Sequence, residues 1–259
     1  MHIIVLAGGQ GKRMKSSLPK VLHLVNDKPM LLMIIEQVRN FNPSKIIVVV
    51  GKYYEIIKST LLKYTKLDDI TFVFQEPALG TGHAVLCTLN ELEPTNDNIT
   101  LNELEPNCVN IILNGDTPLI QYTTIKDIYD VFVKNNCSLQ ITCTELDNPT
   151  NNGRIIISDK GQFEKIVEEK DCTDKERNIN LVNCGIYIAT TNILKKYIPQ
   201  ITNMNAQKEY YLTDLVEIYK KTNNNVGLYT LPKDKQVEIT NVNTKEQLDQ
   251  LNNLIVPVI

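Results

Sequence analysis

Short apolar runs alternate with amphipathic stretches along the first half of the chain. Residues 30–38 and 54–64 carry apolar side chains at helical spacing, and in the second stretch Ile57, Leu61 and Tyr64 would share one face. The runs typical of buried strands are residues 3–6, 45–50, 70–74 and 109–116. Strands and helices in this order predict a doubly wound, Rossmann-like α/β fold with a mostly parallel sheet. In such sheets, ligands bind beyond the carboxyl ends of the strands.

The pattern changes near residue 149, where hairpins replace the alternation of strands and helices. Residues 153–157 and 163–167, joined by a turn at 159–161, predict a β-hairpin. Thr244 and Gln247 have the spacing of a capping box at the start of a final helix. The other predicted elements are strands at 139–143 and 226–231, a helix at 124–133, and a helix opening at 207–214 with Leu212, Leu215, Val216 and Tyr219 on one face.

One short segment occurs twice, because residues 88–94 and residues 100–106 both read TLNELEP. Repeat architectures recur several times at longer periods, so this single duplication does not indicate one. An acidic copy that ends in proline is expected to extend a surface connection, and loops tolerate such insertions at small entropic cost. We assign the duplication no function and expect one copy to be dispensable.

The composition fits one large α/β domain. The 259 residues are 42% hydrophobic and carry a net charge of −3, with a pI of about 5.7. A chain so near neutrality presents no broad basic surface, so neither nucleic-acid nor membrane binding is indicated. The first apolar run is too short for a secretory signal, and no run approaches the length of a membrane span. The six cysteines have no C-x-x-C pair and no zinc spacing, which indicates reduced thiols in a cytoplasmic protein.

The most glycine-rich turn follows the first predicted strand, in residues 6–20, LAGGQGKRMKSSLPK. Gly8, Gly9 and Gly11 let the backbone turn sharply and approach a ligand, and successive N–H groups in such turns bind anions. Cations follow within a few residues: Lys12, Arg13, Lys15 and Lys20. The segment fits neither the Walker nor the G-x-G-x-x-G pattern, so the glycines alone leave a plain connector with surface lysines open. Glycines and cations together indicate a polyphosphate site.

Further candidates follow later strands at the same predicted edge of the sheet. Gln75 follows the strand at 70–74, and residues 80–82 (GTG) would open a helix whose start can face a base or phosphate. Asp116 ends the apolar run at 109–116, and a carboxylate there suits Mg²⁺, which prefers oxygen ligands. The residues alone leave two plainer interpretations open: an aspartate that stabilises its own turn, and an ordinary strand-to-helix turn at 80–82.

The glycine-rich segment, with residues 18–23 (LPKVLH) and 28–30 (KPM), resembles the signature of sugar-1-phosphate nucleotidyltransferases. The likeness is closest to the N-terminal uridylyltransferase domain of bacterial bifunctional N-acetylglucosamine-1-phosphate uridylyltransferases. It covers nearly the whole chain, in order, through several independent motifs. It implies the nucleotide-diphospho-sugar transferase type of fold, the substrates UTP and N-acetylglucosamine 1-phosphate, and Mg²⁺ as cofactor.

The resemblance assigns roles to the first set of candidates. It makes Arg13 and Lys20 catalytic groups that lie along the triphosphate. It makes Asp116 and Asn243 the ligands of Mg²⁺, although an asparagine before a helix is more often only a cap. The residues that it places on the nucleotide are Leu6, Ala7, Gly8, Gly9, Gly11, Gln75, Gly80 and Thr81.

The second half of the chain resembles the sugar-binding half of that family, through residues 153–155 (GRI), 167–171 (VEEKD) and 183–186 (NCGI). By resemblance, Gly153, Glu168 and Asn183 bind the sugar hydroxyls and the N-acetyl group. An E-E-K-D run is otherwise usually a solvated charged edge. The chain departs from the family pattern at two positions that are often aromatic, which are Asn114 and Asn152 here.

The resemblance implies a nucleotide-binding half at about residues 1–148, a sugar-binding half at 149–243 and a C-terminal helical tail at 244–259. No left-handed β-helix acetyltransferase domain is expected, so any homo-oligomer would not form through one. The expected reaction makes UDP-N-acetylglucosamine and pyrophosphate by in-line nucleotidyl transfer. Two alternatives stay open: another sugar or nucleotide, such as glucose 1-phosphate with dTTP, and a non-catalytic module that binds nucleotide sugars and regulates a partner.

Overall fold

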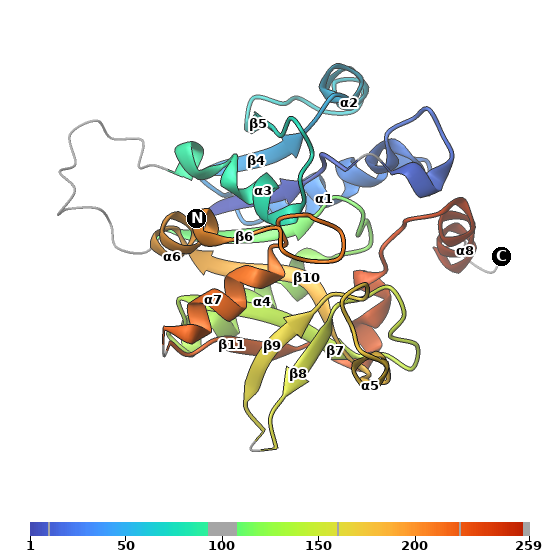
Figure 1. Cartoon of the computed structure of the whole chain (residues 1–259). Helices are drawn as coiled ribbons and strands as arrows, with labels where there is room; N and C mark the ends of the chain where they lie inside the picture. The colour runs from blue at the N-terminus through green and yellow to red at the C-terminus, as the bar shows by residue number, and fades with distance from the viewer. Residues whose placement is uncertain (10, 93–107, 160, 223, 256–259) are drawn as a thin grey trace, which may run out of the picture.

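A nine-stranded mixed sheet organises the protein, which we describe from a computed structural model (Figure 1). The structure describes residues 1–9, 11–92, 108–159, 161–222 and 224–255. Along the sheet, the strands lie in the order β11 (Gly227–Thr230), β7 (Leu139–Glu145), β10 (Leu181–Thr190), β6 (Val109–Asn114), β1 (His2–Leu6), β4 (Lys45–Val50) and β5 (Ile70–Phe74). The hairpin of β8 (Arg154–Ile157) and β9 (Phe163–Val167) joins this sheet through β10, and β2 (Leu24–Val25) pairs separately with β3 (Lys28–Pro29).

The parallel part of the sheet has the pattern that its sequence predicts. β1 pairs in parallel with both β4 and β6, and β4 pairs in parallel with β5. Side chains of β1 are buried on both faces: Ile3 and Val5 belong to one hydrophobic cluster and Ile4 to the other. A strand covered on both faces needs an unbroken apolar run, which is why residues 3–6 lack polar alternation. The predicted mostly parallel α/β fold is confirmed.

Helices cover both faces of the sheet. The cluster that contains Ile3 takes side chains from α1 (Met30–Arg39), α2 (Tyr54–Leu61) and α4 (Tyr122–Lys134). The cluster that contains Ile4 takes side chains from α3 (Thr81–Leu86), α6 (Thr191–Tyr197) and α7 (Thr213–Lys221), while the short α5 (Asp174–Arg177) follows the β8–β9 hairpin. None of the helices in the described part of the chain is long and apolar enough to cross a membrane.

The structure differs from the sequence prediction at several elements, and three of the differences concern the sheet and the helices that cover it. The pattern did not reveal β10, the antiparallel strand between β6 and β7. α2 ends at Leu61, so Tyr64 is 48% exposed and does not share the buried face of Ile57 and Leu61. α7 begins at Thr213 and not at 207, which leaves residues 207–212 as an irregular segment in which only the end, Tyr211 and Leu212, is buried.

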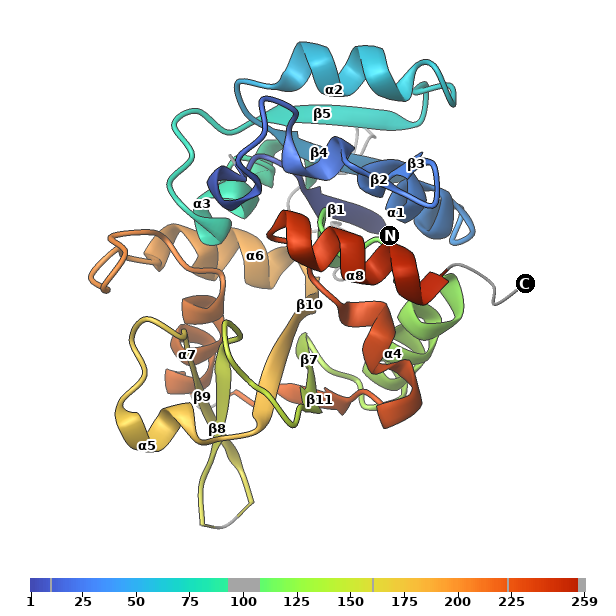
Figure 2. The ribbon, with the colours of Figure 1, turned by 90° about the vertical axis from the view of Figure 1, so that its right-hand side faces the viewer.

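The C-terminal helix α8 (Lys245–Ile255) packs beside the glycine-rich segment (Figure 2). The predicted capping box is present, since Thr244 Oγ1 accepts from the Gln247 N–H at 3.2 Å and Gln247 Oε1 accepts from the Thr244 N–H at 3.2 Å. α8 contributes Leu248 and Leu251 to a small third cluster with Met14, Val25, Met30 and Val242. Because Met14 directly follows Arg13 in the sequence, packing of α8 against Met14 also helps to hold Arg13 in place.

The duplicated segment is packed where the structure describes it. In the first copy, Leu92 is 1% exposed, Thr88 is fully buried, and the Glu91 carboxylate forms an ion pair with Lys45 at 2.9 Å. The rest of the first copy and all of the second lie outside the described residues. Residues 88–92 therefore belong to the packed part of the protein, and the expectation that the added copy extends a surface connection stays a prediction.

Deletion of residues 90–101 is nevertheless expected to preserve the fold and the activity. The deletion joins Leu89 to Asn102 and leaves one intact TLNELEP segment, in which Leu104 can take the place of Leu92. We expect the thermal unfolding midpoint of the deletion variant to match that of the wild type. As a control, Leu92→Ala should cost about 2–5 kcal/mol, as buried leucine truncations do. A deletion variant as unstable as Leu92→Ala would show that the two copies are not interchangeable.

Candidate active site

A cleft of about 690 Å³ lies at the carboxyl ends of the parallel strands. It is walled by the loops that follow β1, β5 and β6, by the amino-terminal half of the antiparallel β10, and by segments before α7 and α8. Every site residue predicted from the sequence lines this cleft: Leu6, Ala7, Gly8, Gly9, Gly11, Arg13, Lys20, Gln75, Gly80, Thr81, Asp116, Gly153, Glu168, Asn183 and Asn243. The structure thus brings together residues that are spread over almost the whole sequence.

The glycine-rich segment turns back on itself beside Lys20. Gly11 has φ +58°, in the left-handed region, and a Cβ at this position would lie 2.7 Å from the Cβ of Lys20. Glycine is therefore required at residue 11 both by the backbone conformation and by the close approach of Lys20. Residues 12–14 then form a short 3-10 helix that buries Met14 and leaves Arg13 exposed at the cleft. Gln10 lies outside the described residues.

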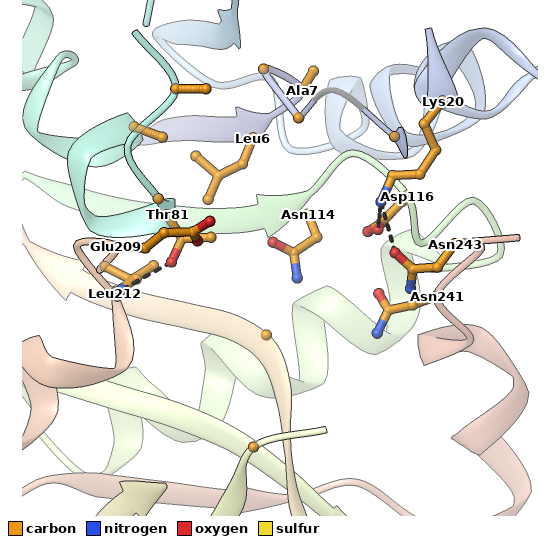
Figure 3. Close-up of a pocket in the computed structure, with 18 of the residues that line it drawn as sticks. Leu6, Ala7, Lys20, Thr81, Asn114, Asp116, Glu209, Leu212, Asn241 and Asn243 are labelled. Atoms are coloured by element: carbon orange, nitrogen blue, oxygen red, sulfur yellow. Dashed lines mark hydrogen bonds and ion pairs between the residues drawn. The ribbon is translucent and has the colours of Figure 1, made fainter. Parts of the chain in front are cut away.

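Two oxygens converge on cationic side chains at one end of the cleft (Figure 3). The Lys20 ammonium forms an ion pair with the Asp116 carboxylate and donates to Asn243 Oδ1 at 3.0 Å. Arg13 Nη2 donates to the same Asn243 oxygen at 3.0 Å. Lys20 and Asp116 are mostly buried, with 15% and 14% of their side chains exposed, so solvent screens their interaction only partly.

A backbone hydrogen bond places Asn243 beside Asp116. The Val242 N–H donates to the carbonyl oxygen of Asp116 at 3.0 Å. Val242 is fully buried in the third cluster, whereas its neighbours Asn241 and Asn243 both line the cleft. An extended segment alternates its side chains in this way, so burial of the valine aims both asparagines at the cleft.

Gln75 and Thr81 connect the nucleotide side of the cleft to the segment before α7. Gln75 is buried, and its Nε2 donates to the Gly80 carbonyl oxygen at 2.8 Å. Thr81 Oγ1 accepts from the Leu212 N–H at 2.9 Å. Gly80 has φ +113°, and a Cβ there would lie 2.6 Å from the carbonyl oxygen of Tyr210. The helix start at Gly80 is thus fixed by tight contact with residues 210–212.

Glu168 and Asn183 are held in place at the other end of the cleft. Glu168 Oε1 accepts from Thr213 Oγ1 at 3.0 Å, and Asn183 Nδ2 donates to the Tyr187 hydroxyl at 2.7 Å. The Asn183 N–H also donates to the Gly153 carbonyl oxygen at 2.8 Å. The pairing register of β10 shifts after Asn183, and residues 183–185 and 187 line the cleft at this irregularity.

This end of the cleft is acidic, and burial shifts its titration. Burial raises the pKa of Glu168, and the nearby Asp171 and Glu209 raise it further, against the hydrogen bond from Thr213. Burial together with the charges of Glu217 and Glu168 raises the pKa of Asp214 to about 6. Both carboxyls favour their neutral form more than an exposed acid does. Of the two, Glu168 lines the cleft, where hydrogen bonds from a bound polyol would stabilise its ionised form.

The two departures from the family pattern also line the cleft. Asn114 lies at its centre (Figure 3), where its Nδ2 would be 2.3 Å from a Cβ at Gly185. Asn152 precedes Gly153 and donates weakly to carbonyl oxygens of its own loop. At both positions this chain therefore has an amide side chain where the family pattern often has an aromatic one.

Sequence reasoning missed several residues of the cleft. Thr213 was treated only as part of a helix, and Tyr187 lies on the strand that was not predicted. Asn241 had no signal beyond its spacing of two from Asn243, yet its Oδ1 is buried and has no hydrogen-bond partner among the described residues. Tyr210 and Tyr211 are not among the lining residues, which include Gln207, Glu209, Leu212 and Thr213.

The pair of Asp116 and Asn243 fits a magnesium ion better than a transition metal. No group of three or more His, Cys, Asp or Glu side chains in the described part of the chain could hold a metal. Mg²⁺ needs no such group, since it commonly takes one or two carboxylates and fills its coordination with phosphates and water. The carboxylate and the amide oxygen already converge on one positive charge, the Lys20 ammonium, so their placement suits a cation.

The sequence matches the family model described as Nucleotidyl transferase over residues 2–235. It is 50% identical over 255 residues to the probable UDP-N-acetylglucosamine pyrophosphorylase of Acanthamoeba polyphaga mimivirus, across 98% of this chain and 96% of the viral protein. It is 39% identical over 252 residues to the bifunctional protein GlmU of Thermoanaerobacter pseudethanolicus, across 97% of this chain and 51% of GlmU. The chain therefore spans about half the length of that bacterial relative.

Solved structures share the fold at low sequence identity. UDP-glucose pyrophosphorylase complexed with UDP-glucose aligns with a TM-score of 0.73 and 16% identity, across 98% of this chain and 97% of that chain. HddC from Yersinia pseudotuberculosis aligns with a TM-score of 0.68 and 18% identity, across 98% of both chains. These similarities establish a common architecture and carry no information about the substrate.

Proposed function

This chain belongs to the nucleotidyl transferase family, and on that premise we propose that it makes UDP-N-acetylglucosamine and pyrophosphate from UTP and N-acetylglucosamine 1-phosphate. The observation that carries the proposal is the convergence of Arg13, Lys20, Asp116 and Asn243 at one end of a cleft whose other end holds Glu168 and Asn183. The identity of the substrates follows from relatives that match nearly the whole chain. The division into a nucleotide-binding half and a sugar-binding half belongs to the same proposal.

The reaction joins two phosphates without a covalent enzyme intermediate. An oxygen of the sugar phosphate attacks the α-phosphorus of UTP in line, and the bond from that phosphorus to the bridging oxygen of the β-phosphate breaks. The electron pair leaves with pyrophosphate, so negative charge grows on the leaving group. Catalysis then consists mostly of positioning and charge stabilisation, which Lys20 and Arg13 supply from one side of the cleft.

Asp116 and Asn243 would hold Mg²⁺ through their side-chain oxygens. When bound, the ion would withdraw charge from the phosphates and align the two reactants. Lys20, which contacts both of these side chains in this structure, and Arg13, which contacts Asn243, would then be available to the phosphate oxygens. One carboxylate beside two cations keeps the local charge positive, as a site for a triphosphate and a sugar phosphate requires.

The opposite end of the cleft supports an acetamido sugar. Glu168 can accept bonds from sugar hydroxyls, and Asn183 offers an amide beside the Gly153 backbone. A site built from such groups rejects a substrate that lacks the matching polar atom, because its own groups are then left unpaired.

We expect N-acetylglucosamine 1-phosphate to be used at least about 100-fold more efficiently than glucose 1-phosphate, since binding and turnover both depend on paired polar groups. The measurement is kcat/KM in a coupled pyrophosphate-release assay, with UTP and dTTP each tested against both sugar phosphates. Equal efficiency with both sugars would contradict the roles of Glu168 and Asn183. Binding of nucleotide sugar without turnover of any pair would instead favour a non-catalytic regulatory module.

A further inference from the structure

The first residue of β8 is an arginine buried inside the protein. Arg154 is 1% exposed and does not line the cleft, although its neighbour Gly153 does. Burial of a guanidinium is costly unless its hydrogen bonds and charge are matched. The contacts of Arg154 therefore identify what the protein uses it for.

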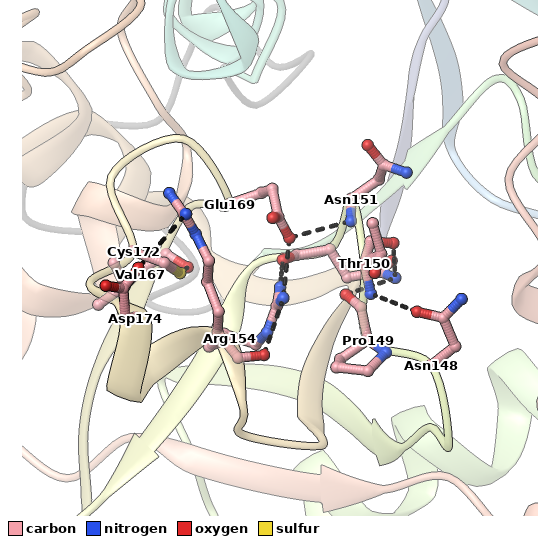
Figure 4. Close-up of polar contacts among 11 residues, drawn as sticks. Asn148, Pro149, Thr150, Asn151, Arg154, Val167, Glu169, Cys172 and Asp174 are labelled. Carbon is pink, nitrogen blue, oxygen red and sulfur yellow. Dashed lines mark hydrogen bonds and ion pairs between the residues drawn. The ribbon is translucent and has the colours of Figure 1, made fainter.

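Three chain segments meet at the Arg154 guanidinium (Figure 4). Nη2 forms an ion pair with the Glu169 carboxylate at 2.8 Å and also reaches the Arg177 carbonyl oxygen at 3.4 Å. Nη1 donates to the carbonyl oxygen of Asn152. The same Glu169 oxygen accepts from the Asn151 N–H at 3.0 Å. One guanidinium and one carboxylate thus tie the loop before β8 to the turn after β9 and to the end of α5.

The segments tied by Arg154 are those that carry the sugar end of the cleft. Asn152 is followed by Gly153, and Glu169 is preceded by Glu168. A Cβ at Gly153 would lie 3.6 Å from the Glu168 carboxylate, which is van der Waals distance, so the two cleft residues lie next to each other. The Gly153 carbonyl oxygen in turn accepts from Asn183. A small shift of either segment would change the spacing of Gly153, Glu168 and Asn183 together.

Stability alone does not account for this arrangement. Arg154 Nε is buried without a hydrogen-bond partner among the described residues, so the guanidinium is only partly matched. Buried ion pairs with incomplete hydrogen bonding contribute little net stability, and apolar replacements are often neutral or stabilising. Burial alone would raise the pKa of Glu169, but the hydrogen bonds from Arg154 and Asn151 hold that pKa below its usual value, so the carboxylate is ionised at neutral pH.

We propose that Arg154 is a positioning residue for the sugar phosphate: it fixes the Gly153 backbone relative to the Glu168 carboxylate without touching the substrate. This inference rests on the proposed function, which places the sugar phosphate at that end of the cleft. The planar guanidinium group, with its several N–H donors, is suited to hold three acceptors at fixed separations, which a lysine ammonium cannot do. Loss of the guanidinium should weaken sugar-phosphate binding. It should leave UTP binding unchanged, since Lys20 and Gln75, which are proposed to bind UTP, lie on other elements.

Arg154→Lys is expected to raise KM for the sugar phosphate by at least about 10-fold, on the scale at which displacements near 1 Å act. KM for UTP should stay within about twofold of the wild-type value. Arg177→Lys is the matched control, because it keeps the positive charge and the carbonyl oxygen that Arg154 reaches. Its side chain forms an ion pair with the exposed Asp174 at 3.7 Å, so this variant should leave both constants unchanged. Equal rises in the two KM values for Arg154→Lys would overturn the proposal.

The double variant Arg154→Met/Glu169→Met separates positioning from stability. Replacing both ions by apolar groups should keep the thermal unfolding midpoint near the wild-type value. The sugar-phosphate KM is expected to stay raised, because the bonds that Arg154 and Glu169 make to residues 151 and 152 are then lost. Recovery of that KM together with the midpoint would show that the ion pair serves stability only.

A crystal structure of the Arg154→Lys variant tests the inference independently of the reaction. It should show Gly153 displaced from Glu168, and the bond from the Asn151 N–H to Glu169 lost. An unchanged spacing would refute the positioning role even if the enzyme used other substrates. Failure of the wild-type protein to turn over UTP with any sugar phosphate would refute the proposed function and not this geometric result.

Discussion

Asp116→Asn is expected to lower kcat by about 100-fold or more, the scale of losing one preorganised electrostatic contact. Asparagine keeps the size of the side chain and removes its charge. The Asp116 carboxylate faces the Lys20 ammonium at the end of the cleft where both phosphates would meet, with only 14% of its side chain exposed. Without that charge, the proposed Mg²⁺ site would retain only neutral protein oxygens.

The measurement is kcat at saturating substrates over a range of Mg²⁺ concentrations. The variant should need more Mg²⁺ for half-maximal rate and should not reach the wild-type rate. Asn243→Ala should act in the same direction more weakly, because a neutral amide attracts a cation less than a carboxylate does. Asp127→Asn, which removes an exposed carboxylate that pairs with Lys235, is the control and should change neither value.

Folding should be little affected by Asp116→Asn. The side chain lies at the cleft, while the backbone at this residue is fixed by the bond from the Val242 N–H to its carbonyl oxygen, which asparagine keeps. Near-normal turnover at saturating Mg²⁺ would show that Asp116 is not a metal ligand. A complex with substrates in which Asp116 and Asn243 contact different groups would have the same consequence.

The parallel strands could be predicted because burial on both faces leaves an unbroken apolar run. β10 could not, although it is the longest strand in the part of the chain that the structure describes, with the sequence LVNCGIYIAT. Its amino-terminal half supplies Asn183 to the cleft and contains a bulge with Gly185 at φ +73°. Polar and glycine residues that serve the site interrupt the apolar pattern, so the signal of the strand is weakest where its function is concentrated.

The glycines and cations at residues 8–20 indicate a phosphate site by themselves, but the sugar-binding residues and Asn243 were found only through the family resemblance. Nothing in the local sequence shows that Asn243 reaches Asp116, since the bond that joins their segments depends on the third cluster and on α8. The Thr213–Glu168 hydrogen bond was equally invisible, because Thr213 read as part of a helix that begins earlier. Arg154 belonged to a recognised motif, but only the structure shows which segments its guanidinium joins.

Lys20→Met is expected to reduce kcat/KM by about 100-fold or more, through loss of a positive charge aimed at the phosphates. Methionine preserves much of the length and the apolar stem of the side chain. Gly11 packs against the Cβ of Lys20, so the fold of the glycine-rich segment should survive the change. Lys126→Met, which removes an exposed lysine of α4, should leave the rate unchanged.

The combination of Lys20→Met with Asp116→Asn distinguishes a shared role from two separate ones. Their side chains form an ion pair, and Lys20 also reaches the second proposed metal ligand, Asn243. Residues that act through one another show losses that do not add, so the double variant should lose clearly less than the product of the two single losses. In the absence of metal, Lys20→Met leaves Asp116 as a mostly buried carboxylate without its ion pair, and the second substitution relieves that cost. Strictly multiplicative losses would mean that the ion pair seen here has no part in the reaction.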